Sequence, residues 1–164
     1  MSTASSPASS RGIHPLNVLL AEDDSADIEF IRDALTATGL PVLLDVVTDG
    51  ADAWDYLRRQ GTYGDAARPH LIMLDLRLPR LQGWEVLASL KTDPHLRTIP
   101  VVILSASDED EIVYESYRLY ANAYVVKSGN PEVFRGSLQA FAAFYLGAAR
   151  LPPEAPPFSE RDVS

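Results

Sequence analysis

Residues Leu71–Pro79 read LIMLDLRLP, and this short stretch decides the fold. Its apolar run, flanked by Pro69 and Pro79, is typical of a strand that is buried on both faces. The strand ends at Asp75, and a carboxylate is costly to bury without a partner. A purely structural role explains this residue poorly, so we expect Asp75 to lie in a charged site at the carboxyl end of the strand.

Short apolar runs alternate with helical periods on both sides of this stretch. Continuous apolar runs indicate parallel strands that helices cover on both faces, and right-handed crossovers make such a sheet doubly wound. We predict an α/β fold with a five-stranded parallel sheet and five helices. The predicted strands are Leu16–Ala21, Val42–Val47, Leu71–Leu74, Val101–Leu104 and Ala123–Val126, and the predicted helices are Ser25–Thr38, Ala51–Gln60, Gly83–Thr92, Asp108–Tyr120 and Pro131–Arg150.

Polar side chains follow the predicted strands at the edge where doubly wound sheets bind ligands. They are Glu22, Asp23 and Asp24 after the first strand, Asp75 after the third, Ser105 after the fourth and Lys127 after the fifth. Carboxylates gathered in this way need a cation, and oxygen ligands of this kind suit Mg²⁺. An Asp in such a site can attack a phosphoryl group while the metal and an ammonium group neutralise the developing charge.

Four segments resemble, in order and spacing, the motif regions of bacterial response-regulator receiver domains. They read LLAEDDSAD (19–27), LIMLDLRLPRLQG (71–83), VVILSAS (101–107) and AYVVKS (123–128). Each motif is weak alone, but four in register at predicted strand ends are very specific. The resemblance runs from about Leu16 to Leu146, and it implies a flavodoxin-like sheet with strand order 2-1-3-4-5.

The resemblance implies a phosphoacceptor and a metal site. Asp75 matches the phosphoacceptor, and Asp23 matches a direct Mg²⁺ ligand. Glu22 would hold the ion through water, and the backbone carbonyl of Arg77 would be a further ligand. The expected metal site is therefore Glu22, Asp23, Asp75 and Arg77.

The resemblance also implies the remaining roles at the site. Ser105 would hydrogen-bond the phosphoryl oxygens, and Lys127 would pair with them, so Asp75, Ser105 and Lys127 are the expected catalytic residues. Tyr124 occupies the position of an aromatic switch, which would act together with Ser105.

Three longer stretches are similar to the single-domain receivers that partner phytochrome histidine kinases. They are GTYGDAARPHLIMLDLRLP (61–79), DPHLRTIPVVILSAS (93–107) and YRLYANAYVVKSGN (117–130). The long segment around Gly61–Pro69 and the pair Lys127-Ser128 carry most of this match. The implied partner is a phytochrome-type histidine kinase.

Three residues depart from the general receiver pattern. Ser128 stands where most receivers have a proline that often follows a cis bond, and a cis bond before serine costs about 2.5–4 kcal/mol. We therefore predict that the peptide between Lys127 and Ser128 is trans. Arg77 brings a charge close enough to reach the phosphoryl group, and Ser105 replaces the commoner Thr.

Simpler explanations exist for several of these residues. Asp24 is better explained as a helix N-cap than as a metal ligand, and Asp27 as a partner of the helix dipole. Ser105 could merely cap its loop. Tyr124 could be ordinary core packing.

Signal relay through phosphorylation of Asp75 is the leading hypothesis, in which the chain catalyses its own phosphotransfer and dephosphorylation without being an enzyme in the usual sense. An interaction module that is never phosphorylated is the alternative. An aspartyl phosphatase would need a second acid at the position of Arg77, and a flavin module would need a Ser/Thr/Gly-rich loop after the first strand. Neither feature is present in the sequence.

Length and composition limit the other possibilities. The 164 residues allow one domain, which we place at residues 16–150 between expected disordered tails at residues 1–15 and 151–164. A net charge of −9 argues against nucleic-acid binding. The apolar runs are too short to span a membrane, and the N-terminus lacks an apolar signal region, so we expect a cytoplasmic protein. The sequence has no cysteine, which excludes disulfides and thiolate chemistry.

The last predicted helix has more apolar surface than one face of a sheet can cover. Phe134, Leu138, Phe141 and Tyr145 form one stripe, and Val133, Ala140 and Phe144 form a second beside it. The preceding helix adds Tyr114 and Tyr117, together with Tyr120. We therefore predict a homodimer whose interface contains Tyr114, Tyr117, Val133, Ala140 and Phe144. Packing of the second stripe on the chain's own tail, through Pro152, Pro153 or Phe158, is the alternative.

Overall fold

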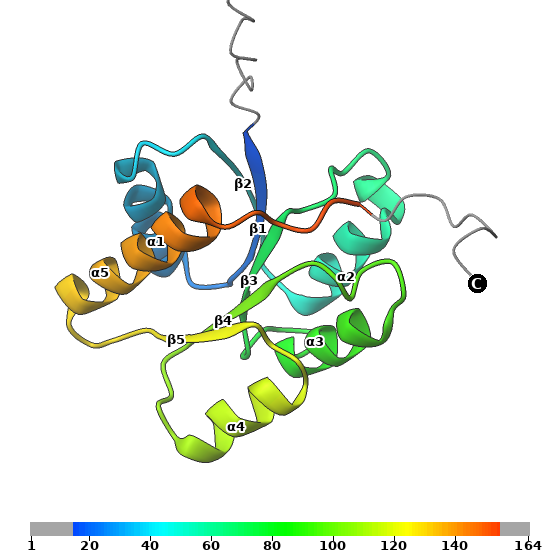
Figure 1. Cartoon of the computed structure of the whole chain (residues 1–164). Helices are drawn as coiled ribbons and strands as arrows, with labels where there is room; N and C mark the ends of the chain where they lie inside the picture. The colour runs from blue at the N-terminus through cyan, green and yellow to red at the C-terminus, as the bar shows by residue number, and fades with distance from the viewer. Residues whose placement is uncertain (1–14, 155–164) are drawn as a thin grey trace, which may run out of the picture.

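A computed structural model describes residues 15–154, and its sheet confirms the predicted topology (Figure 1). Five parallel strands lie in the order β2-β1-β3-β4-β5. The strands are β1 (Leu16–Ala21), β2 (Val42–Val47), β3 (Leu71–Asp75), β4 (Val101–Ser105) and β5 (Ala123–Val126). The helices are α1 (Ser25–Ala37), α2 (Gly50–Arg58), α3 (Gly83–Thr92), α4 (Asp110–Arg118) and α5 (Pro131–Ala142), with a short 3₁₀ turn η1 (Gly61–Tyr63) between α2 and β3.

Helices cover both faces of the sheet, as Figure 1 shows. Side chains alternate along each strand, so Leu19 of β1 packs toward α2 and α3, whereas its neighbour Leu20 packs toward α1 and α5. All five residues of β3 and all five of β4 are buried. Each fully buried leucine contributes roughly 2 kcal/mol of transfer free energy. The two packed layers hold the strand ends in fixed positions at the carboxyl edge.

Several helices end earlier than the sequence predicts. Helix α2 ends at Arg58, because Arg59 takes the left-handed conformation with φ 54° and caps the helix. Helix α4 is shorter at both ends than the predicted Asp108–Tyr120, since Glu109 is its N-cap and Tyr120 has φ 70°. Propensity does not reveal such caps, because they depend on the loops that follow.

The predicted last helix, Pro131–Arg150, is wrong in its final third. The α-helix ends at Ala142, and a wider π-helical turn, η2, covers Ala143–Ala148. Ala149 then becomes extended, with its N–H donating to the carbonyl of Phe144 at 2.7 Å. Two consecutive prolines follow at 152 and 153, and they favour an extended chain in the residues before them. This segment runs from the end of α5 across the sheet toward α2 (Figure 1).

The predicted tails lie largely outside the described residues. Only Pro15 of the N-terminal tail and residues 151–154 of the C-terminal tail are described, and Phe158 is not. Disorder of both tails therefore stays a prediction. Pro152 and Pro153 do not bury the second apolar stripe, because Phe144 is still 57% exposed. None of the helices between residues 15 and 154 is long and apolar enough to cross a bilayer.

Candidate functional site

The polar residues predicted at the strand ends meet in one cavity at the carboxyl edge of the sheet. Pairing in register places Asp75 opposite Leu104 in the next strand, and Ser105 opposite Val126, one residue before Lys127. The N–H of Glu22 donates to the carbonyl of Val47, which fixes the end of β1. A cavity of about 510 Å³ is lined by Glu22, Asp23, Asp24, Asp27, Asp75, Arg77, Ser105, Ala106, Ser107, Asp108, Glu109 and Lys127.

Lys127 is the centre of the cavity's hydrogen bonds. Its Nζ donates to Asp75 Oδ2 at 2.8 Å, to Asp27 Oδ2 at 3.0 Å and to Glu22 Oε2. Its side chain is only 11% exposed. Burial by itself lowers the pKa of Lys127, but the hydrogen bonds to Asp75 and Glu22 outweigh burial and raise this pKa above its ordinary value. Lys127 therefore stays charged in the cavity.

Glu22 is fully buried beside the other carboxylates. Burial is the largest effect and raises the pKa of Glu22 from 4.5 to about 7, although the hydrogen bond from Lys127 partly offsets it. The backbone N–H of Asp24 also donates to Glu22 Oε1 at 3.1 Å. Burial therefore disfavours the charged form of Glu22, and a further cation beside it would favour that form.

Glu22, Asp23 and Asp75 fit a divalent cation. Each offers a carboxylate oxygen, and these oxygens all lie within 4.8 Å of one another. Asp23 is exposed to the cavity, whereas the other two are buried. A cluster of carboxylates that opens to water is the donor set that Mg²⁺ prefers. The carbonyl of Arg77 as a further ligand stays a prediction.

The backbone orients the Asp75 carboxylate. The N–H of Arg77 donates to Asp75 Oδ1 at 2.9 Å, which leaves Oδ2 for Lys127. Helix α3 begins directly against this segment. A Cβ built on Gly83 would lie 2.1 Å from the carbonyl oxygen of Asp75, so only glycine permits this approach. The side chain of Arg77 is exposed at the rim of the cavity.

A chain of hydrogen bonds joins Ser105 to Tyr124. The N–H of Ser107 donates to Ser105 Oγ at 3.1 Å, and the Tyr124 hydroxyl donates to the carbonyl of Ser107 at 2.6 Å. Both predicted switch residues therefore hold the same loop between β4 and α4. Tyr124 also packs on the core beneath α3 and α4, so packing and hydrogen bonding coexist at this position.

The structure decides two of the simpler explanations. Asp24 is the N-cap of α1, as predicted, because its Oδ1 accepts the N–H of Asp27 at 2.9 Å. Asp27 was expected only to face the helix dipole, but its carboxylate also pairs with Lys127. One weak signal for this role is visible in the sequence, namely an acid on the first turn of a helix that begins at the site. The structure places Asp27 in the cavity although the motif comparison did not assign it.

The peptide between Lys127 and Ser128 is trans, as predicted, since the described residues contain no cis bond. Two hydrogen bonds hold the trans segment. The N–H of Lys127 donates to the carbonyl of Ser105 at 2.7 Å, and the N–H of Asn130 donates to Ser128 Oγ at 3.1 Å. Asn130 then caps α5 through the N–H of Glu132. Lys127 thus reaches Asp75 without the proline that the general pattern has.

This fold and this cavity define a phosphoacceptor module, and the chain belongs to the response regulator receiver domain family, whose profile matches residues 18–139. Response regulator Rcp1 of Synechocystis sp. is 38% identical over 138 residues, covering 84% of this chain and 94% of Rcp1. The crystal structure of the phosphorylated cyanobacterial phytochrome response regulator RcpA superposes with a TM-score of 0.82 at 41% identity, covering 85% of this chain and all of RcpA.

A third comparison bears on the metal. The crystal structure of the Mn²⁺-bound form of Rcp1 has a TM-score of 0.82 and 38% identity, and covers 85% of this chain and 100% of that chain. Receiver domains bind Mg²⁺ at an acidic pocket, and the carboxylate cluster described above is a pocket of this kind. The protein is a two-component response regulator.

Proposed function

We propose that this receiver takes a phosphoryl group from a histidine kinase onto Asp75 and that its own residues catalyse both the transfer and the later hydrolysis. The observation that carries the proposal is the position of the Asp75 carboxylate. It lies in the cavity with one oxygen held by a backbone N–H and the other 2.8 Å from Lys127 Nζ. A nucleophile oriented in this way, beside a fixed positive charge, is what phosphoryl transfer requires.

The chemistry follows from this arrangement. An oxygen of Asp75 attacks phosphorus as the P–N bond of the kinase phosphohistidine breaks, and the electron pair of that bond stays on the imidazole nitrogen. Lys127 and Ser105 stabilise the charge that develops on the phosphoryl oxygens. When bound, Mg²⁺ at Glu22, Asp23 and Asp75 supplies further positive charge to those oxygens. Water later attacks the acyl phosphate and restores the carboxylate.

Phosphorylation would be read out through the loop between β4 and α4. Ser105 Oγ now accepts the N–H of Ser107, and Tyr124 is bound to the carbonyl of the same Ser107. A phosphoryl group that recruits the Ser105 hydroxyl therefore disturbs both bonds. This coupling supports Ser105 and Tyr124 as the switch pair.

The kinase partner we propose is a phytochrome-type histidine kinase. Two of the similar structures are response regulators that are named for phytochromes, the cyanobacterial RcpA and the bacteriophytochrome response regulator RtBRR, and a third is a response regulator in red light signalling of R. palustris. Because a histidine kinase draws its phosphoryl group from ATP, we place the encounter in the cytoplasm.

Phosphotransfer from a phytochrome-type kinase tests the proposal. The wild type should become labelled in the presence of Mg²⁺, and Asp75→Asn should lose labelling by at least about a thousandfold because the nucleophile is gone. Acetyl phosphate serves as a second donor, so that a mismatched kinase is told apart from an inert receiver. Failure of the wild type with both donors would favour the alternative, an interaction module that is never phosphorylated.

We also propose that two copies pair through α4 and α5. Phe144 in η2 is 57% exposed, Val133 in α5 is 54% exposed and Tyr114 in α4 is 68% exposed, and Tyr117 and Ala140 are exposed as well. Burying a ring such as Phe144 is worth roughly 1.5–3 kcal/mol. Large apolar side chains left in water on one surface favour a symmetric pair.

Sedimentation of Phe144→Glu tests the pairing. The wild type should be a dimer at tens of micromolar, and the variant should dissociate at least about tenfold more readily, because the pairing would bury a carboxylate. Leu43→Glu is the matched control, since Leu43 is 55% exposed on the opposite edge strand β2. A monomeric wild type, or equal effects of the two variants, would contradict the pairing.

A further inference from the structure

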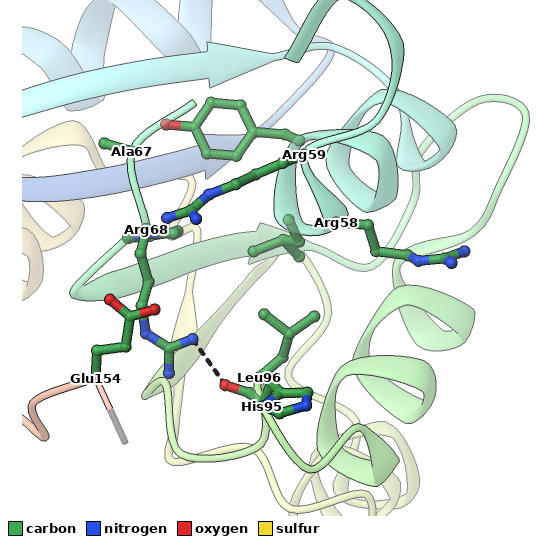
Figure 2. Close-up of a pocket in the computed structure, with 10 residues that line it drawn as sticks. Arg58, Arg59, Ala67, Arg68, His95, Leu96 and Glu154 are labelled. Carbon is green, nitrogen blue, oxygen red and sulfur yellow. Dashed lines mark hydrogen bonds between the residues drawn. The ribbon is translucent and has the colours of Figure 1, made fainter. Parts of the chain in front are cut away.

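A second charged cavity lies at the amino-terminal edge of the sheet, opposite the phosphorylation site. It is formed by the end of α2, the segment that enters β3 and the loop that enters β4 (Figure 2). Arg59 and Arg68 line it together with His95, and the last described acid, Glu154, lines it as well. The cavity has a volume of about 180 Å³.

The two arginines are held in place by neutral oxygens. Arg68 Nη1 donates to the carbonyl of His95 at 2.7 Å, the bond drawn in Figure 2, and Nη2 donates to Thr98 Oγ1 at 3.3 Å. Arg59 Nε donates to the carbonyl of Ala66 at 3.1 Å. A guanidinium has five N–H donors, so each side chain is fixed in position and keeps donors to spare. The arrangement is preorganised for an anion.

The positive charge of this cavity is not paired with a carboxylate at contact distance, although Glu154 is one of the lining residues. Between residues 15 and 154, no carboxylate oxygen lies within 4.0 Å of a guanidinium nitrogen of Arg59 or Arg68. Arg58, the neighbour of Arg59, also lines the cavity, but its guanidinium lies over the ring of Trp54 at 5.7 Å and extends away from Arg59 and Arg68 in Figure 2. Two fixed cations without a partner are unexpected in a chain of net charge −9.

The C-terminal segment delivers a carboxylate to this place. After η2 the chain runs extended from Ala149 across the sheet, and it reaches the cavity at Glu154 (Figure 1). Pro152 and Pro153 restrict the backbone just before Glu154 and so reduce the entropy lost on docking.

We propose that this cavity is a carboxylate receptor for Glu154, and that residues 149–154 form a strap which fastens the end of α5 to the α2–α3 side of the same molecule. In this structure Glu154 lines the cavity, but its carboxylate lies more than 4.0 Å from both guanidinium groups. In the docked strap, the guanidinium groups of Arg59 and Arg68 supply the donors and the carboxylate of Glu154 accepts them. The strap is independent of phosphorylation, because it uses none of the residues at the carboxyl edge.

Trypsin reports on the strap in the full-length protein, because the bond between Arg150 and Leu151 lies inside it. Cleavage there removes residues 151–164 and is followed by mass spectrometry. Glu154→Gln should raise the cleavage rate about fivefold, and so should the double variant Arg59→Gln/Arg68→Gln, as expected for a partly exposed ion pair. Arg58→Gln is the matched control and should leave the rate unchanged.

Combining the substitutions shows whether Glu154→Gln acts by releasing the strap from the arginines or by changing how trypsin recognises the nearby Arg150. Once Arg59 and Arg68 are replaced, Glu154→Gln should have no further effect on cleavage. Equal effects of Glu154→Gln in both backgrounds, or an effect of Arg58→Gln as large as that of the double variant, would overturn the proposal. Protection that disappears on dilution would also overturn it, since it would place the segment on a second copy. If replacing Arg68 loosens the loop before β4, the single variant Arg59→Gln takes the place of the double variant in this experiment.

Discussion

The two charged cavities lie at opposite edges of one sheet, and they are unbalanced in opposite directions. At the carboxyl edge, Lys127 faces several acids, and Glu22 is buried among them. At the amino-terminal edge, Arg59 and Arg68 face the single acid Glu154. The first cavity therefore needs a cation from solution, whereas the chain can supply the anion for the second. In each cavity, the excess charge therefore indicates a partner of the opposite sign.

The largest expected change in unfolding free energy comes from the tight backbone packing beside the carboxyl-edge cavity. Gly83→Ala should lower the free energy of unfolding by about 3 kcal/mol or more, because its Cβ would lie 2.1 Å from the backbone oxygen of Asp75. Gly64→Ala, in the segment between η1 and Arg68, should change it by less than about 0.5 kcal/mol, since its nearest contact is 3.7 Å away. Urea unfolding measures both, and equal effects would refute the contrast.

Acid titration tests the carboxyl-edge cavity, where Glu22 is buried and its pKa is strongly raised. The folded protein binds the Glu22 proton more tightly than the unfolded chain, since burial raises this pKa from 4.5 to about 7. The resulting stabilisation is complete below pH 4.5 and is lost as the pH rises through 7.

In EDTA, the unfolding free energy of the wild type should therefore fall between pH 5 and 7.5 by about 2–3 kcal/mol more than that of Glu22→Gln. Mg²⁺ should reduce this fall, because the ion replaces the proton as the positive charge. Parallel curves for the wild type and Glu22→Gln in EDTA would show that Glu22 does not titrate in this range.

The smallest expected change in unfolding free energy comes from removing one carboxylate charge, and it has opposite signs at the two edges of the sheet. Asp23→Asn should raise the unfolding free energy of the metal-free protein by about 0.5–1 kcal/mol, because it removes one of several like charges. The same variant should lose most of the stabilisation that Mg²⁺ gives the wild type. Glu154→Gln should slightly lower the unfolding free energy. Thermal unfolding with and without Mg²⁺ measures all three, and a destabilised Asp23→Asn would contradict the charge argument.

The carboxyl-edge site could be predicted from the sequence because each residue follows a strand whose apolar run is visible locally. For example, Asp75 follows the apolar run Leu71–Leu74, and Lys127 follows Ala123–Val126. Parallel strands bring such residues together whatever the loops do. For Asp27, the sequence predicts the position on the first helical turn but not the contact with Lys127, because that contact joins residues that are 100 positions apart.

The arginine cavity gave no comparable signal. Arg59 and Arg68 lie in or beside a loop, and the cavity also needs His95 and Glu154, which are far from them in the sequence. The early end of the last α-helix was equally hidden. The run from Leu138 to Ala149 has good helical propensity, and only the three-dimensional structure shows that it widens into a π turn after Ala142. Backbone choices of this kind depend on packing at each position rather than on propensity.

The reach of Lys127 has a consequence for how the protein is made. Its contacts with Glu22, Asp27 and Asp75 span 105, 100 and 52 residues. A ribosome synthesises the chain from the N-terminus, so the acids emerge long before the lysine that compensates them. A nascent chain that stops before β5 contains Asp75 but lacks Lys127, the charge that we propose acts on it. In the proposed function, Asp75 can therefore receive a phosphoryl group only after β5 has been synthesised and has paired with the sheet.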